Sequence, residues 1–251
     1  NLTRQVDWLS TAANPATATV YDAYGNPLST TDPNGNTTTF AYDPTHTFVT
    51  QTTNARNQTT LATYDPGTGN MLSTTDPNGY STTYGYDAFG RVIREVRPYD
   101  SIAFPTISYE YAIDGTAPEG VVVRQRTTAG QPAALNVYTF VDGFNRVLQT
   151  RPPAENNSVQ IVTNTYYNDR GLVSAQSVPH LLPYASTYAT PQTGIRATRV
   201  TYDPVGREIE VTNPDDTVRR IVYDHWRIDL IDENGHTISR YQDAYDNIFF
   251  F

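Results

Sequence analysis

Histidine, aspartate and arginine are the residue types in this sequence that could do chemistry. The four histidines, His46, His180, His225 and His236, stand apart, and no two of them have a metal-site spacing. The chain has no cysteine and no lysine, which excludes thiolate zinc sites, a cysteine nucleophile and Schiff-base catalysis. Neither a serine nucleophile elbow nor a phosphate-binding glycine loop is present. We therefore expect no enzyme activity, no catalytic residue, no metal site and no cofactor.

The aspartates have a simpler explanation than acid–base catalysis. Asp32 and Asp76 each begin an Asp-Pro-Asn-Gly sequence, in which the Asp side chain can bond the backbone two residues on and the glycine closes the turn. The oxygen-rich residues 32–36 could be imagined as a calcium loop. They lack, however, the length and the final bidentate glutamate of an EF-hand. Turn formation therefore explains these aspartates without a reaction.

Composition sets the class of protein. The 251 residues have a net charge of -9, so no broad basic surface is available for nucleic acid. The longest purely aliphatic run, Val121 to Val123, is far shorter than a membrane span. The sequence has 19 tyrosines, 15 glycines and 17 prolines together with many threonines, which favours strands and turns over helices. We expect an all-β, soluble chain.

A repeat runs through most of the chain. Tyr-Asp dyads occur eight times, against about 1.4 expected at random. Six of them share one register, with local spacings of 21 or 22 residues, and those at Tyr99 and Tyr245 fall outside it. A second turn sequence lies inside each period, so each period predicts two strands. The structural repeat positions are Tyr21, Asp22, Gly25, Gly35, Tyr42, Asp43, Tyr64, Asp65, Gly69, Gly79, Tyr86, Asp87, Gly90, Tyr202, Asp203, Gly206, Tyr223, Asp224 and Gly235.

Some turns replace the repeat glycine with another residue that tolerates a positive φ. The substitutes are His46, Asn57, Asn145, Asp216 and Asp246. We expect the backbone conformation to be kept at these positions while the side chain changes.

Between the turns lie runs of five to seven residues in which threonine alternates with aromatic residues. Phe40 and Tyr42 share one face of such a run, as do Tyr84 and Tyr86, which is typical of strands. We expect each dyad tyrosine to pack on the equivalent ring of the next hairpin. Because one short hairpin cannot bury its apolar face, the hairpins must pair edge to edge into a curved β-hairpin spiral.

Two stretches break the rhythm, near residues 98–137 and 178–197. Both are rich in proline, and we expect irregular loops or elaborated hairpins that project from the sheet. Neither has the composition of a linker, so residues 1–251 are expected to form a single continuous repeat segment. The pattern begins and ends within the repeats, which suggests an excerpt of a larger protein.

The repeat motifs resemble a known family. Residues 21–26, 31–36 and 86–91 are similar to the YD repeats of bacterial Rhs (rearrangement hotspot) proteins, which eukaryotic teneurins share. Residues 142–150, 202–207 and 232–236 resemble, more narrowly, the Rhs region of Tc toxin B components and plasmid virulence proteins.

The resemblance implies a secreted or cell-surface bacterial protein and a β-strand spiral that forms part of a hollow shell. Such a shell would enclose and shield a cargo polypeptide. The implied partners are the remainder of the shell, the cargo and other toxin-complex subunits, with no nucleic acid and no membrane span. The family's autoproteolytic core segment has no counterpart in these residues.

A second hypothesis remains open from the residues themselves. Tyr24, Tyr80, Tyr184 and Tyr188 could be exposed and form a glycan-binding or cell-adhesion surface.

Overall fold

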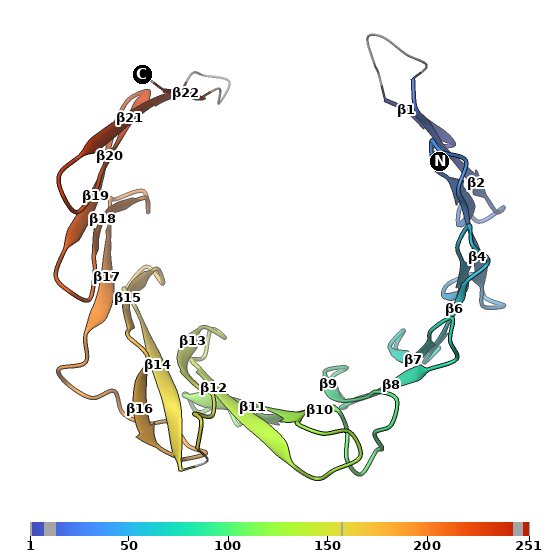
Figure 1. Ribbon diagram of the computed structural model, residues 1–251, viewed down its shortest axis with the longest axis horizontal. Helices are drawn as coiled ribbons and strands as arrows, with labels where there is room; N and C mark the ends of the chain where they lie inside the picture. Colours follow the sequence, from blue (N-terminus) through green and yellow to red (C-terminus); the bar gives the residue numbers. More distant parts are fainter. Residues whose placement is uncertain (1, 8–13, 157, 243–247, 251) are drawn as a thin grey trace. The chain divides into compact units, whose positions relative to one another are not determined.

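The computed structural model describes residues 2–7, 14–156, 158–242 and 248–250 (Figure 1). The chain divides into two compact units, residues 1–109 with 124–134 and residues 110–123 with 135–251. We call them unit 1 and unit 2. The expectation of a single continuous repeat segment stays a prediction.

The described residues form strands and turns and no helix, so the all-β prediction is confirmed. The strands up to the division within β10 are β1 (Arg4–Val6), β2 (Ala16–Tyr21), β3 (Pro27–Thr31), β4 (Thr37–Tyr42), β5 (Val49–Thr53), β6 (Thr59–Tyr64), β7 (Met71–Thr75), β8 (Ser81–Tyr86), β9 (Val92–Val96) and β10 (Ile107–Ala112). The later strands are β11 (Glu119–Arg126), β12 (Ala134–Val141), β13 (Val147–Arg151), β14 (Val159–Tyr167), β15 (Val173–Ser177), β16 (His180–Pro183), β17 (Ala197–Tyr202), β18 (Glu208–Thr212), β19 (Val218–Asp224), β20 (Arg227–Ile231), β21 (Thr237–Gln242) and β22 (Ile248–Phe250).

Unit 1 is an antiparallel meander. Each strand from β1 to β9 pairs with the next one along the chain, and β9 pairs with the first residues of β10. Short turns join neighbouring strands because each turn sequence reverses the chain within a few residues. The order of the strands in space is therefore the order of the repeats in the sequence.

Unit 2 continues the same pattern with one insertion. β12, β13, β14 and β15 pair in succession, and β17 to β22 do the same. β15 pairs with β17, so β16 is left out of the succession and instead pairs with the first half of β14. The long strand β14 thus has two neighbours on one edge, β16 near its start and β15 near its end.

The sheet is a single layer over most of its length. The molecule exposes 16356 Å², whereas a compact monomer of 28.0 kDa would expose about 11,000 Å². Among the described residues of unit 1, only Gly85 and Val96 are buried. Both faces of the unit 1 sheet are therefore accessible, and its stability rests mainly on pairing between neighbouring strands.

The turns share one backbone design. In the turn after β2, the Gly25 amide donates to Asp22 O at 3.2 Å, and the Asp22 amide donates to Asn26 O at 2.8 Å. This is a type I turn closed by a residue with positive φ. The predicted glycine substitutes His46, Asn57, Asn145 and Asp216 all have a φ between 56° and 68°, which confirms the expectation. Asp246 lies outside the described residues.

Most hairpins that turn at a dyad position also contain a β-bulge, but the hairpin at Tyr223 does not. Tyr21 pairs with Pro27 while Val20 pairs with Ser29, so Leu28 is an extra residue on the second strand. The same register shift occurs beside Tyr42, Tyr64, Tyr86, Val141, Tyr167 and Tyr202. A bulge increases the local right-handed twist. A regular repeat of bulges therefore twists the sheet at regular intervals.

The turn design makes a testable prediction at Gly79, which has a φ of +85° and open space where a Cβ would lie. We expect Gly79→Ala to lower the free energy of unfolding by about 1 kcal/mol, because alanine is strained in the left-handed region. Gly143→Ala is the matched control, since Gly143 also has open space but no positive φ. Chemical denaturation of the two variants measures the difference, and equal stabilities would contradict the assigned turn.

The two irregular stretches contain strands as well as loops. Residues 98–137 include β10, β11 and the start of β12, and residues 178–197 include β16. Residues 184–189 do not project from the sheet but lie against β12, β13 and β14 of unit 2, through contacts described below. The sequence did not show this packing because the residues that hold the segment come from strands about 40 positions earlier.

Candidate functional site

The aspartate at the dyad position, which follows a valine in the degenerate copy Val141-Asp142, holds its turn through both carboxylate oxygens. In the turn after β12, Oδ1 of Asp142 accepts the amides of Phe144 at 2.9 Å and Arg146 at 3.0 Å, and Oδ2 accepts Nε of Arg146 at 2.7 Å. The Arg146 side chain is the main reason that the pKa of Asp142 lies below its usual value. Asp87 and Asp203 make the same contacts with Arg91 and Arg207.

The dyad tyrosine reaches back to the preceding strand. Tyr42 donates its hydroxyl to Pro27 O at 2.9 Å, and Tyr86 donates to Met71 O at 2.8 Å. Pro27 and Met71 are the first residues of β3 and β7, immediately after the previous dyad turn. Tyr21, Tyr167 and Tyr202 donate in the same way to Leu2 O, Val147 O and Val173 O. Each of these bonds ties one repeat to the repeat before it.

Two dyad tyrosines make the same connection through their rings. Tyr64 stacks on Phe48, with ring centroids 4.9 Å apart. The centroid of the Tyr223 ring lies 4.0 Å from the guanidinium carbon of Arg207. Phe48 and Arg207 again stand at the exit of the preceding dyad turn. These contacts differ from the expected packing of one dyad ring on the next. Equivalent rings are two strand spacings, about 9–10 Å, apart, which exceeds the reach of ring stacking.

The tyrosine bond can be tested within unit 1. Tyr86→Phe removes the hydroxyl that donates to Met71 O and is expected to destabilise the fold by about 1 kcal/mol. Tyr64→Phe is the control, because the Tyr64 hydroxyl makes no hydrogen bond in the described part of the chain and its ring contact with Phe48 is kept. If denaturation shows equal losses for the two variants, the tyrosine hydroxyl does not join the repeats.

Unit 2 also contains a group of fully buried polar side chains that the sequence did not reveal. Arg151 is 1% exposed and donates to Gln160 Oε1 at 3.0 Å, to Thr187 O at 2.8 Å and to Pro183 O at 2.9 Å. Gln149 is 0% exposed and exchanges two hydrogen bonds with the backbone of Ala189. The strand alternation places Gln149 and Arg151 on one face of β13. Only the fold shows that residues 184–189 cover that face.

A scan against protein-family models matches residues 21–59 and 64–102 to the RHS Repeat family. Unit 1 carries RHS repeats. Each matched stretch begins at a dyad tyrosine, Tyr21 or Tyr64, and so covers two dyad hairpins of unit 1. The resemblance drawn from the motifs is thereby confirmed. A search of curated protein sequences found no match.

Solved structures match the fold of nearly the whole chain. The crystal structure of TcdB2-TccC3 matches with a TM-score of 0.78 and 20% identity, covering 94% of this chain and 15% of that one. The TcdB2-TccC3-Cdc42 crystal structure gives 0.78 and 16% identity, and covers 98% of this chain and 18% of that one. The Tc holotoxin pore of Photorhabdus luminescens gives 0.76 and 17%, with the same two coverages of 98% and 18%. This chain thus has the fold of a small part of these much longer chains.

One of the predicted dyads departs from the repeat design. Tyr223 and Asp224 both lie in β19, and Asp224 pairs with Arg227 across a two-residue turn formed by His225 and Trp226. The Asp224 carboxylate contacts His225 Nδ1 at 2.8 Å instead of closing a turn. The turns after Asp43 and Asp65 are each longer by one residue, with the bonds of each carboxylate shifted accordingly.

Two of the four histidines contact aspartates that open turns. Nδ1 of His46 lies 3.3 Å from Asp22, and Nδ1 of His236 lies 2.9 Å from Asp232. Within the described ranges, no three His, Asp or Glu side chains gather in a way that could hold a metal ion. In the candidate calcium loop, residues 32–36, the Asp32 carboxylate is used within the turn itself. It accepts hydrogen bonds from Asn34 and Asn36. The described part of the chain also has no helix that could cross a membrane.

The four tyrosines of the adhesion hypothesis are divided between the two units. In unit 1, Tyr24 is 73% exposed with its ring 4.4 Å from His46, and Tyr80 contacts Tyr99. In unit 2, Tyr184 and Tyr188 turn toward β12 and pack edge-on against Tyr138 and Phe140, respectively. Tyr188 is half-buried by this packing, whereas Tyr184 remains 42% exposed.

Proposed function

We propose that this segment is part of a shell wall that encloses and shields a cargo polypeptide, within a toxin-type protein. The observation that carries the proposal is a single-layer sheet of RHS repeats with both faces accessible and almost no core of its own in unit 1. A sheet of this kind obtains little stability from burying its own side chains. Such a sheet is suited to form a wall between an enclosed interior and the solvent outside.

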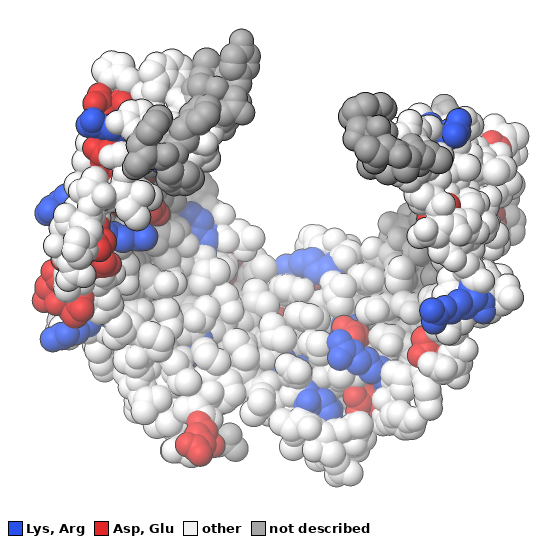
Figure 2. Space-filling view, turned by 45° about the horizontal axis from the view of Figure 1, so that its top comes forward, with Lys and Arg blue, Asp and Glu red and all other residues white. Residues whose placement is uncertain are grey.

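The means of shielding is steric. In the described part of unit 1, neighbouring hairpins are joined by strand pairing and by the dyad tyrosines, and a wall built in this way would keep a protease out. The surface visible in Figure 2 is largely uncharged, with acidic and basic groups in small mixed clusters. With a net charge of -9 and no lysine, such a wall would attract an unfolded polypeptide only weakly.

The fold likeness supports the assignment of partners. The matched structures contain TcdB2 together with TccC3, and one of them is a Tc holotoxin pore. By analogy, the partners proposed for this chain are the rest of its own shell, the cargo and other toxin-complex subunits. The proposed location is secreted or at the bacterial cell surface. The proposed role is structural, and no step of catalysis is assigned to these residues.

Protease protection tests the proposal. The full-length protein is digested under native conditions with a non-specific protease, and the surviving peptides are identified by mass spectrometry. A sequence outside the RHS repeats should survive together with them, and it should be digested once the sheet is unfolded by denaturant. If every sequence outside the repeats is cleaved while the sheet is intact, the repeats do not enclose a polypeptide.

A further inference from the structure

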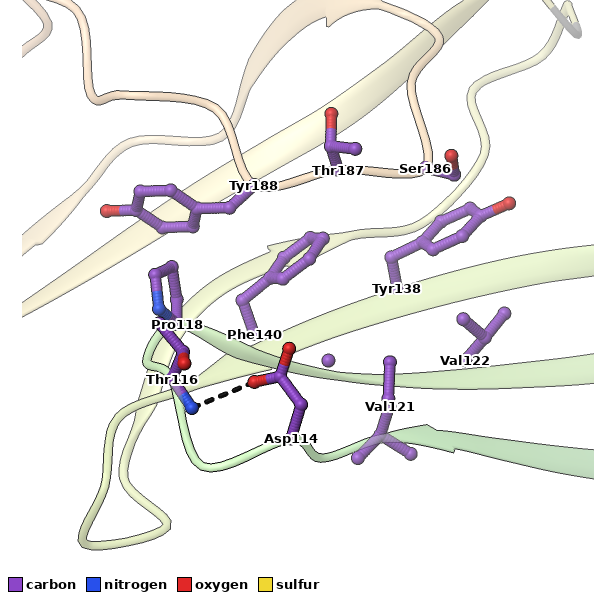
Figure 3. A pocket seen from close by; sticks show the side chains of 12 residues that line it. Asp114, Thr116, Pro118, Val121, Val122, Tyr138, Phe140, Ser186, Thr187 and Tyr188 are labelled. Atoms are coloured by element: carbon purple, nitrogen blue, oxygen red, sulfur yellow. Dashed lines mark hydrogen bonds between the residues drawn. The ribbon is translucent and has the colours of Figure 1, made fainter.

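Unit 2 contains a cavity that the enclosure function does not use. It has a volume of about 430 Å³ and lies between residues 112–122, strand β12 and residues 186–188 (Figure 3). This volume is within the range of small-ligand sites in proteins, about 300–1,000 Å³. The cavity is half open to solvent, so a ligand could enter without unfolding the wall.

The upper wall of the cavity is fixed in place by buried bonds. Arg151 holds Thr187 O, and Gln149 holds both backbone polar groups of Ala189. The hydroxyls of Tyr138 and Tyr184 are 2.6 Å apart. These bonds fix residues 186–188 in the absence of a ligand. Binding therefore costs little conformational entropy in this segment.

The lining of the cavity combines aromatic rings with one carboxylate. Tyr138 and Phe140 come from β12, and Tyr188 packs edge-on against Phe140 with centroids 5.8 Å apart. Asp114 faces them from the opposite wall, and Figure 3 shows its carboxylate turned toward the cavity. Oδ1 of Asp114 accepts the amide of Thr116 at 2.8 Å, which fixes the carboxylate.

Aromatic rings beside a carboxylate attract an organic cation. Ring faces attract ammonium and guanidinium groups, and the alkyl stem of such a side chain packs on apolar surface. Among the described residues that line the cavity, Asp114 is the only charged one. The charge at this end of the cavity is therefore negative and complements a basic side chain.

We propose that this cavity binds a basic side chain, lysine or arginine, of a polypeptide segment. Asp114 contacts the charged group, and Phe140, Tyr188 and Val121 contact the alkyl stem. The volume is larger than one side chain and leaves room for part of the peptide on either side. The site stands apart from the proposed enclosure, because a wall can enclose a polypeptide without binding it here.

Peptide binding tests the site. Three dye-labelled peptides, acetyl-Ala-Lys-Ala-amide, its arginine counterpart and its neutral norleucine counterpart, are titrated with the 251-residue chain and followed by fluorescence anisotropy. We expect the two basic peptides, or one of them, to bind about fivefold more tightly than the neutral peptide. Comparing lysine with arginine shows which cation the cavity prefers.

Two variants and a control assign the binding to this cavity. Asp114→Asn keeps an oxygen that can accept the Thr116 amide. This variant should lower the affinity for the basic peptides to that for the neutral peptide. Tyr188→Leu should weaken the binding of all three peptides. Asp169→Asn, at an exposed turn of unit 2, should change nothing. Equal binding of basic and neutral peptides, no effect of Asp114→Asn, or no binding of any peptide would overturn the proposal.

Discussion

Replacing Arg151 with methionine is expected to lower the free energy of unfolding of unit 2 by about 3 kcal/mol. The guanidinium is 1% exposed and bonds Gln160, Thr187 and Pro183. Methionine fills much of the space but donates no hydrogen bond, so three buried acceptors lose a donor. Unpaired buried polar groups are among the largest single costs in protein stability.

Arg219→Met is the matched control, because Arg219 is exposed and makes no hydrogen bond or ion pair in the described part of the chain. Its expected effect is within about 0.5 kcal/mol. Hydrogen exchange at the amides of Ala185 and Ala189 locates the damage, since both amides are bonded by side chains next to Arg151. Equal stability of the two variants would show that Arg151 does not hold residues 184–189 on the sheet.

Acidification is expected to weaken the fold throughout its length. The pKa of Asp142 is lowered, first by the Arg146 side chain, and the pKa of Asp32 is lowered, first by the Asn36 side chain. A lowered folded-state pKa contributes stability that is present above the unfolded-state pKa, near 4. That stability is lost as the pH falls through the folded-state value. Because turn aspartates recur, the denaturant midpoint should fall steadily between about pH 5 and pH 2.

Asp142→Asn removes the carboxylate charge while keeping a side-chain oxygen that can accept the turn amides. The chain itself places asparagine at this turn position, where Asn168 accepts the amides of Arg170 and Leu172. The variant therefore keeps the backbone bonds but has no titrating group, and its midpoint should depend less on pH than that of the natural protein. A midpoint that does not change with pH in the natural protein would show that the turn carboxylates do not stabilise the fold.

The sequence predicted the turns well because their chemistry is local. His46 and Asn145 stand three residues after the aspartate that opens the turn, and both have the positive φ that glycine would have. Asp22 and Asp87 close their turns through bonds to residues two and four positions later. Such contacts depend on short stretches of chain, so the residue types alone determine them.

Contacts across strands were harder to predict. Two strands per period already place one strand between successive dyad tyrosines, so the expected ring packing was wrong. The Tyr42 hydroxyl instead donates to Pro27 O, a contact that the spacing did not show. The alternation in β13 placed Gln149 and Arg151 on one face, but not which segment covers it. The Asp224 dyad looked like the others, yet its hairpin turns through two residues. Each of these outcomes depends on residues far away or on the length of a turn.

Cryo-electron microscopy of the full-length protein tests the central claim most directly. The account predicts a wall made of one continuous layer of paired hairpins, with dyad tyrosines joining successive repeats and density for a polypeptide on one side of the wall only. A solid particle, in which both faces of the sheet in unit 1 are covered by packed layers and no space remains for a cargo, would contradict it.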